Sequence, residues 1–109
     1  MSQEFCDYLC EIFEPFAPVQ AKRMFGGYGL FVEGLMFGLV ADNTLYLKVD
    51  EASKAEFVDL DLEAFTYVKN NKPMQMSYYQ APEEIYEDSE QAGLWFNRAY
   101  AAAARSKKK

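Results

Sequence analysis

The side chains best suited to acid–base or metal chemistry are four carboxylates, Glu83, Glu84, Glu87 and Asp88. On a helical turn, positions 84, 87 and 88 would share one face. Such a group could exchange protons or hold a hard cation such as Mg²⁺ or Ca²⁺. A solvated acidic face after Pro82 is the more frequent role of such a run, and we expect that role here.

The sequence contains no histidine. Histidine is the commonest general base near neutral pH and the commonest transition-metal ligand. Its absence excludes Ser-His and Cys-His nucleophilic machinery, and two cysteines cannot complete a structural zinc site alone. Because no nucleophile, base and orienting group form a set, we predict a protein that is not an enzyme and needs no metal or cofactor.

The two cysteines, Cys6 and Cys10, are four positions apart on a predicted helix, so they point to the same side. A disulfide there would constrain little, and a reducing compartment would not keep it. We interpret them as two small apolar residues beside the core, with a redox pair as the alternative.

The stretch KRMFGGYGLFVEGLMFGLV, residues 22–40, holds five of the six glycines. A phosphate-binding glycine loop joins a strand to a helix. Here the residues after Gly29 are β-branched, aromatic and apolar, and Gly34 marks a further turn. The stretch therefore predicts hairpins, and Gly38 inside a strand predicts a bulge or a close contact.

Basic and aromatic side chains near these turns are candidates for binding an anion. Arg23 either forms a salt bridge with an acid such as Asp50 or contacts an anionic ligand. The alternative function is therefore a small anionic-ligand-binding module. Its candidate residues are Arg23, Tyr46, Lys48 and Tyr79.

Composition indicates one domain covering residues 1–109 in the cytoplasm. Half of the residues are hydrophobic and 17% are aromatic, which argues against disorder. No run approaches the ~20 apolar residues of a membrane span, and the acidic N-terminus does not resemble a signal peptide. The net charge of −6 opposes nucleic-acid binding by the surface as a whole.

Charge is unevenly distributed along the chain. Residues 50–66 hold six acids and one base, and residues 81–95 hold five acids and no base. Residues 96–109 hold five bases, namely Arg98, Arg105 and Lys107–Lys109. We interpret this tail as a solvated helix end, with phosphate contact as the alternative. No direct sequence-specific DNA binding is expected.

Hydrophobic periodicity and turn residues predict an α+β domain. Helical spacing runs from Phe5 to Phe16. Alternating segments then predict strands at 19–25, 28–32, 35–41 and 44–49. A helix at 51–58 capped by Asp50, a hairpin around Asn70-Asn71 and a helical turn at 82–88 are predicted next. The last helix is predicted at 89–106, and Asp88 with Gln91 resembles a capping box at its start. The result is an antiparallel sheet of five to six strands, a four-strand meander plus a hairpin, with helices packed on it.

The last predicted helix is apolar on more than one side. Leu94, Trp95, Phe96 and Tyr100 point in different directions, so part of this surface must be buried in the core or in a partner. Trp95 and Tyr100 are therefore candidate partner contacts. We expect action through protein–protein interaction, and a homodimer is one form it could take.

At these residues the chain resembles a known family. RMFGGYGLFVEGLMFGLVADNTLYLKVDE, followed by MSYYQAPEEIYED and LWFNRAYAAA, is similar to the N-terminal domain of the TfoX/Sxy family over about residues 5–105. The resemblance implies a bacterial, cytoplasmic α+β sandwich similar to type III secretion chaperones. Two-domain members regulate natural competence as coactivators that work with the cyclic-AMP receptor protein.

The resemblance sets the leading functional hypothesis. Two-domain members carry a second, helical domain resembling a helix-hairpin-helix module, whereas this sequence ends at Lys109. We therefore expect a stand-alone N-terminal domain. Its predicted function is that of a regulatory adaptor, a competence-type transcriptional coactivator whose partner is a transcription factor or RNA polymerase.

Overall fold

The computed structural model describes residues 2–24 and 27–107. At residues 2, 67–69, 74–76 and 107 it describes the backbone but not the side chains. Short strands and helices follow one another along the chain. The helices are α1 (Ser2–Phe13), α2 (Lys54–Val58), α3 (Glu84–Glu87) and α4 (Ser89–Lys107). The strands are β1 (Gln20–Met24), β2 (Gly27–Val32), β3 (Leu35–Ala41), β4 (Thr44–Lys48), β5 (Ala64–Lys69) and β6 (Lys72–Gln80). The predicted α+β class is confirmed.

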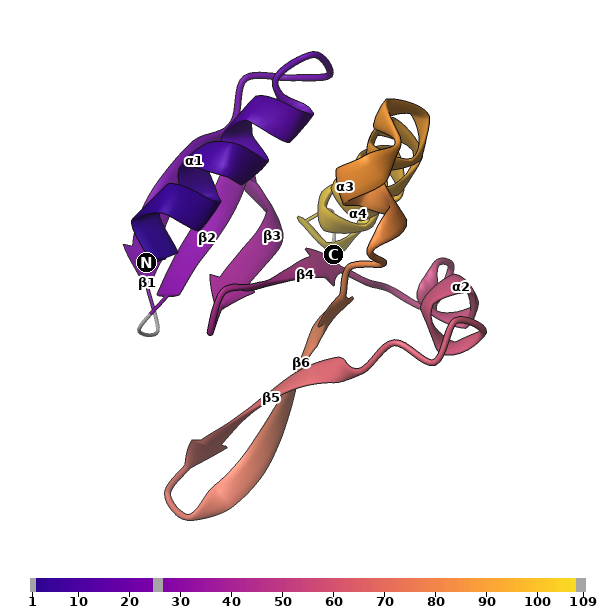
Figure 1. The fold of residues 1–109 in the computed structure, drawn as a ribbon. Coiled ribbons are helices and arrows are strands. Elements are labelled where there is room, and N and C mark those ends of the chain that lie inside the picture. Colours follow the sequence, from indigo (N-terminus) through magenta and orange to yellow (C-terminus); the bar gives the residue numbers. More distant parts are fainter. Residues whose placement is uncertain (1, 25–26, 108–109) are drawn as a thin grey trace.

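The strands form one antiparallel sheet in the order β1-β2-β3-β4-β6-β5. The first four make the predicted meander, and β6 joins the second hairpin to β4. Figure 1 shows the β5–β6 hairpin extending away from the rest of the molecule, with α1, α3 and α4 toward the other end and α2 at the side between them and the hairpin.

Two-residue turns create three of the hairpins. Both central residues have positive φ angles at Glu33-Gly34, Asp42-Asn43 and Asn70-Asn71, as type I′ turns require. Gly26, at the predicted first turn, lies outside the described residues. Gly27 allows close backbone approach, because an added Cβ would lie only 1.9 Å from the carbonyl oxygen of Val40.

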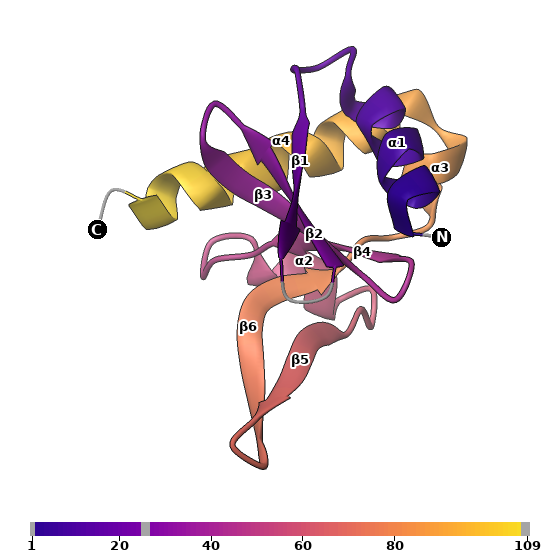
Figure 2. The same cartoon turned by 90° about the vertical axis from the view of Figure 1, so that its left-hand side faces the viewer.

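The described helices all contribute to one core on one face of the sheet. Helix α1 packs on β1–β3 and α4 packs on β3 and β4, an arrangement visible in Figures 1 and 2. The fully buried Phe37 packs against the rings of Phe13 and Phe96, with centroid distances of 5.5 and 4.9 Å, and these two rings also contact each other at 5.7 Å. Fully burying one such side chain contributes about 1.5–3 kcal/mol.

A register shift interrupts the pairing of β2 with β3 between Leu30 and Phe31. Leu30 pairs with Gly38 and Phe31 pairs with Met36, so Phe37 is the extra residue of a bulge. Of the two alternatives predicted from Gly38, a bulge or a close contact, the structure shows the bulge next to this residue, and an added Cβ at Gly38 would meet its nearest neighbours only at 3.4 Å. The bulge lets Phe37 join the core while the strand continues.

Side-chain hydrogen bonds close the turn before α2 and cap the start of α4, whereas the N-cap residue of α2 is Ser53, without a side-chain cap, rather than the predicted Asp50. Asp50 Oδ1 accepts the Ser53 N–H at 3.1 Å, and Ser53 Oγ accepts the Asp50 N–H at 3.1 Å. This reciprocal pair closes a turn over residues 51–53, so the regular helix begins at Lys54 and the predicted start at 51 is corrected. Asp88 Oδ1 accepts the Glu90 N–H at 2.9 Å, which confirms Asp88 as the cap of α4.

Candidate protein-interaction surface

The residues predicted to contact an anion do not form one site. Tyr46 and Lys48 alternate with the buried core residues of β4, so they lie on the sheet face opposite the helices. Tyr79 pairs with the core residue Leu47 and packs against the core on the helix side. The candidate set is thus divided between the two faces of the sheet.

On the helix-free face, Tyr46 and Lys48 cover the sheet itself. The Lys48 ammonium lies 5.1 Å from the ring centroid of Tyr78, and burial lowers the pKa of Lys48. The Tyr46 ring contacts Phe65 edge-on at 5.0 Å. The Tyr78 hydroxyl donates to the Met36 carbonyl at 3.3 Å. These contacts account for both candidates as parts of a packed, half-buried layer.

Arg23 does not form the predicted salt bridge with Asp50. Arg23 is exposed on the edge strand β1, paired with Tyr28 of β2. Asp50 instead accepts hydrogen bonds from Arg105 Nε–H and Nη2–H, the latter at 3.0 Å. The fold brings the end of α4 to the start of the α2 segment, whereas β1 lies at the far edge of the sheet.

Trp95 and Tyr100 belong largely to the core. Trp95 is 3% exposed, and its Nε1–H donates to Glu84 Oε1 at 3.1 Å. Its ring lies 4.9 Å from that of Phe57 in α2. Tyr100 is half-buried and stacks on Phe96 at 5.9 Å. The Trp95 hydrogen bond also gives Glu84 a structural role within the acidic run.

The cysteines are poor nucleophiles in this environment. Both are free thiols on α1, with Cys6 buried in the core and Cys10 half-buried. Burial raises the pKa of Cys6 to about 11 and also raises the pKa of Cys10. Both thiols are therefore protonated near neutral pH, and the interpretation of Cys6 as a small core residue is confirmed.

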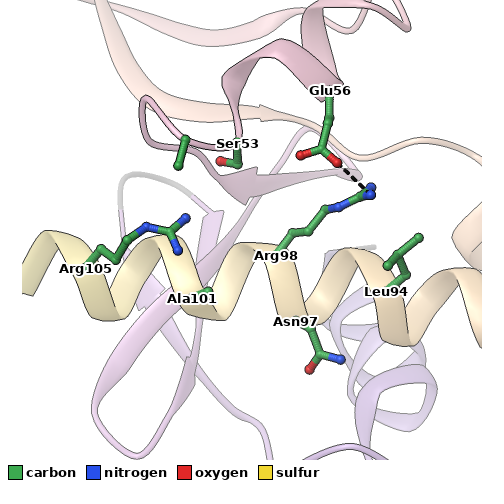
Figure 3. Close-up of a pocket in the computed structure, with 8 residues that line it drawn as sticks. Ser53, Glu56, Leu94, Asn97, Arg98, Ala101 and Arg105 are labelled. Carbon is green, nitrogen blue, oxygen red and sulfur yellow. Dashed lines mark ion pairs between the residues drawn. The ribbon is translucent and has the colours of Figure 1, made fainter.

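A groove runs between α2 and α4 (Figure 3). It has a volume of about 330 Å³. Arg98 and Arg105 point from α4 toward α2, with Ala101 between them, and Asn97 points to the other side. Leu94 borders the groove and is 43% exposed. The lining residues are Ala52, Ser53, Glu56, Leu94, Asn97, Arg98, Ala101 and Arg105.

Both arginines of this groove are neutralised by carboxylates. Arg98 Nη2 lies 2.6 Å from Glu56 Oε2, and its guanidinium lies 4.7 Å from the Trp95 ring centroid. The hydrogen bonds from Arg105 hold the pKa of Asp50 at about 2, well below its usual range. An anionic ligand would have to displace these carboxylates, so the groove suits a mixed polar and apolar protein surface better than a free anion.

Comparison with known proteins identifies the family. A family model described as the TfoX N-terminal domain matches residues 11–103. The chain belongs to this family.

Two curated relatives match parts of this TfoX N-terminal domain. "DNA transformation protein TfoX1" of Aliivibrio fischeri is 39% identical over 62 residues, which cover 57% of the chain and 30% of the relative. "Protein Sxy" of Escherichia coli is 29% identical over 68 residues, which cover 62% of the chain and 32% of the relative. The chain thus spans about a third of the length of these relatives.

Sequence reasoning missed the groove of this TfoX N-terminal domain, although a signal was available. Leu94, Arg98, Ala101 and Arg105 follow the spacing of one helical face, and that face lines the groove. Lys108 and Lys109 of the predicted basic tail lie outside the described residues. Across residues 2–24 and 27–107, the helices lack the length and apolar character needed to cross a membrane.

Proposed function

We propose that this TfoX N-terminal domain is a non-enzymatic regulatory adaptor that binds another protein in a competence-type transcriptional programme. Its membership of the family and its match to a protein named for DNA transformation support the competence assignment. A transcription factor or RNA polymerase is the partner class we propose, in a cytoplasmic setting. Binding of duplex DNA is disfavoured by the net charge of −6.

The observation that carries the adaptor proposal is the groove between α2 and α4. The two arginines of the groove, Arg98 and Arg105, are paired with carboxylates of the same chain, whereas the neighbouring Leu94 is 43% exposed. Protein-binding patches typically combine an apolar centre with a polar rim, and the exposed Leu94 side chain beside fixed, paired charges has this composition. An enzyme site would instead need charged groups free to act on a substrate.

Deletion of the gene in its host, followed by complementation, tests this function. Transcripts of DNA-uptake genes should fall at least about fivefold on deletion and recover with the wild-type chain. Leu94→Asp should fail to restore them, because a buried carboxylate would oppose partner binding. Leu94→Met, which keeps an apolar side chain, is the matched control and should restore expression.

Two results would reject the proposal in separable ways. Unchanged transcripts after deletion would reject the competence-type programme. Full restoration by Leu94→Asp, at equal protein level, would reject the groove as the contact. A homodimer also stays a prediction, and sedimentation velocity of the purified chain over a concentration series measures it directly.

A further inference from the structure

A second groove lies on the side of α2 that faces α3. It has a volume of about 290 Å³ and is lined by Leu60, Leu62, Pro82, Glu83 and Glu84. Two segments distant in the sequence build it: the turn after α2 supplies the leucines, and the segment entering α3 supplies the rest. The groove is therefore formed only in the folded domain.

The apolar part of this groove is partly open to solvent. Leu60 is 50% exposed, and the nearby Val58 is 49% exposed. Leu62 and Pro82 form a more buried floor, since Leu62 packs against the core and Pro82 is buried. Hydrogen bonds from the Leu60 and Leu62 N–H groups to the Phe57 carbonyl, at 3.2 and 3.1 Å, hold the two leucines in place.

Carboxylates line one wall of the groove and adjoin its leucines in the sequence. Glu83 and Glu84 belong to the lining, and Asp59, Asp61 and Glu63 stand next to Leu60 and Leu62 in the chain and are exposed. Residues 50–66 hold six acids against the single base Lys54, and residues 81–95 hold five acids and no base. The two most acidic stretches of the folded chain thus meet at one apolar groove.

Arg98, which lies over the ring of Trp95, is already paired and is not free to offset this charge. Arg98 of α4 is paired with Glu56 at 2.6 Å. Glu84 is oriented by the hydrogen bond from Trp95 at 3.1 Å. The wall of the groove is thereby fixed by the core, while the carboxylates of its rim remain exposed to a partner.

We propose that this groove docks a basic segment of the partner protein, with a large aliphatic side chain seated on Leu60, Leu62 and Pro82 and flanking lysine or arginine residues facing the acidic rim. The charge of the two walls specifies a cationic partner, and the half-exposed leucine specifies an apolar anchor. This inference rests on the proposed adaptor function and adds the chemistry of the partner segment.

Fluorescence anisotropy with a defined probe tests the proposal on the full chain. The probe is a labelled peptide of leucine and lysine at helical spacing, and its counterpart carries glutamate in place of lysine. Wild-type protein should bind the lysine peptide and not the glutamate peptide. Leu60→Asp should weaken binding at least about tenfold, which corresponds to about 1.4 kcal/mol, although it makes the protein more acidic.

Matched variants separate the groove from bulk charge. Glu83→Gln should weaken binding about threefold, because it removes one rim carboxylate. Glu33→Gln removes the same charge from the exposed β2–β3 turn. This control should leave the dissociation constant within about twofold of wild type.

Several outcomes would overturn the inference. These are no binding of the lysine peptide, undiminished binding by Leu60→Asp, or equal weakening by Glu33→Gln and Glu83→Gln. Concentration-dependent dimerisation that Leu60→Gln abolishes would instead assign the groove to a second copy. Circular dichroism checks that each variant folds. The peptide assay and the transcript assay have separate readouts, so failure of the peptide assay leaves the adaptor function standing, and failure of the transcript assay is recognised on its own.

Discussion

Exposed apolar side chains occur on two sides of this molecule, and their surroundings differ. On the α1 side, Tyr8 is 45% exposed but stacks on Tyr86 at 6.1 Å. Phe16 is 37% exposed but stacks on Phe96 at 6.2 Å. Around α2, the exposed aliphatic residues border open grooves instead. The exposed fraction alone therefore does not identify a recognition surface.

The difference comes from how each region is attached to the core. Near α1, rings lie against rings, and Gly93 of α4 makes room for Phe16, because an added Cβ would lie 2.7 Å from its ring. Helix α2 is attached mainly through Phe57, which contacts Trp95 and Tyr79. One buried anchor holds a short helix while leaving its flanks available to a partner.

Phe37→Ala should have the largest effect on stability. The side chain is fully buried between α1 and α4, so its loss leaves a cavity and should cost about 3–5 kcal/mol of unfolding free energy. Urea denaturation followed by circular dichroism measures the change. Phe37→Leu should cost clearly less, and a loss below about 1 kcal/mol for Phe37→Ala would contradict the assignment of the core.

Trp95→Phe should have an intermediate effect at the joint between α2 and α4. The substitution keeps an aromatic ring but removes the donor to Glu84 Oε1, so we expect a loss of about 1–2 kcal/mol. A double-mutant cycle with Glu84→Ala isolates the hydrogen bond. Additive losses in that cycle would show that the two residues do not interact.

A matched pair tests the comparison between the two sides. Tyr8→Ala should cost about 1 kcal/mol, because it removes a stacked ring pair. Leu60→Ala should change stability by less than about 0.5 kcal/mol, because its side chain borders an open groove. Thermal unfolding of both variants measures the difference. A larger loss of stability for Leu60→Ala than for Tyr8→Ala would contradict the distinction between the two regions.

A pH dependence is expected at the Asp50–Arg105 pair. The pKa of Asp50 in the folded protein is about 2, below the ~3.9 of an unfolded aspartate. The pair therefore stabilises the fold above about pH 4, and this contribution is lost as pH falls toward about 2. The stability difference between wild type and Asp50→Asn should shrink over that window, as measured by urea unfolding at each pH.

Arg105→Gln provides the control for that pH series. It should reduce the same acid dependence, because the hydrogen bonds from Arg105 are the largest cause of the low Asp50 pKa. A wild-type advantage over Asp50→Asn that persists undiminished below pH 2 would contradict the pair's role.

Local signals in the sequence predicted most of the fold. Asp42-Asn43 and Asn70-Asn71 tolerate positive φ, so each specified a two-residue turn, and the turns fixed the neighbouring strands. Asp88 predicted the start of α4 because capping depends on residues adjacent in the chain. These features need no knowledge of distant contacts.

The candidate site was less predictable because it depends on long-range packing. Alternation along β4 places Tyr46 on the opposite sheet face from Leu45 and Leu47. Which of the two faces is covered depends on where the helices pack, and the sequence pattern of β4 does not contain that information. The partner of Asp50 proved to be Arg105, 55 positions away, rather than Arg23. Likewise, the groove at Leu60 exists only because the segment entering α3 folds against the turn after α2.

Photo-cross-linking in the host cell tests most directly whether the α2 side is the recognition surface. Benzoylphenylalanine is placed in turn at Leu60, Leu94, Tyr8 and Phe16, four exposed apolar positions divided between the two sides. We predict that Leu60 and Leu94 cross-link to the same partner protein and that Tyr8 and Phe16 do not. Cross-linking to that protein from Tyr8 or Phe16, with none from Leu60 or Leu94, would contradict the proposed surface.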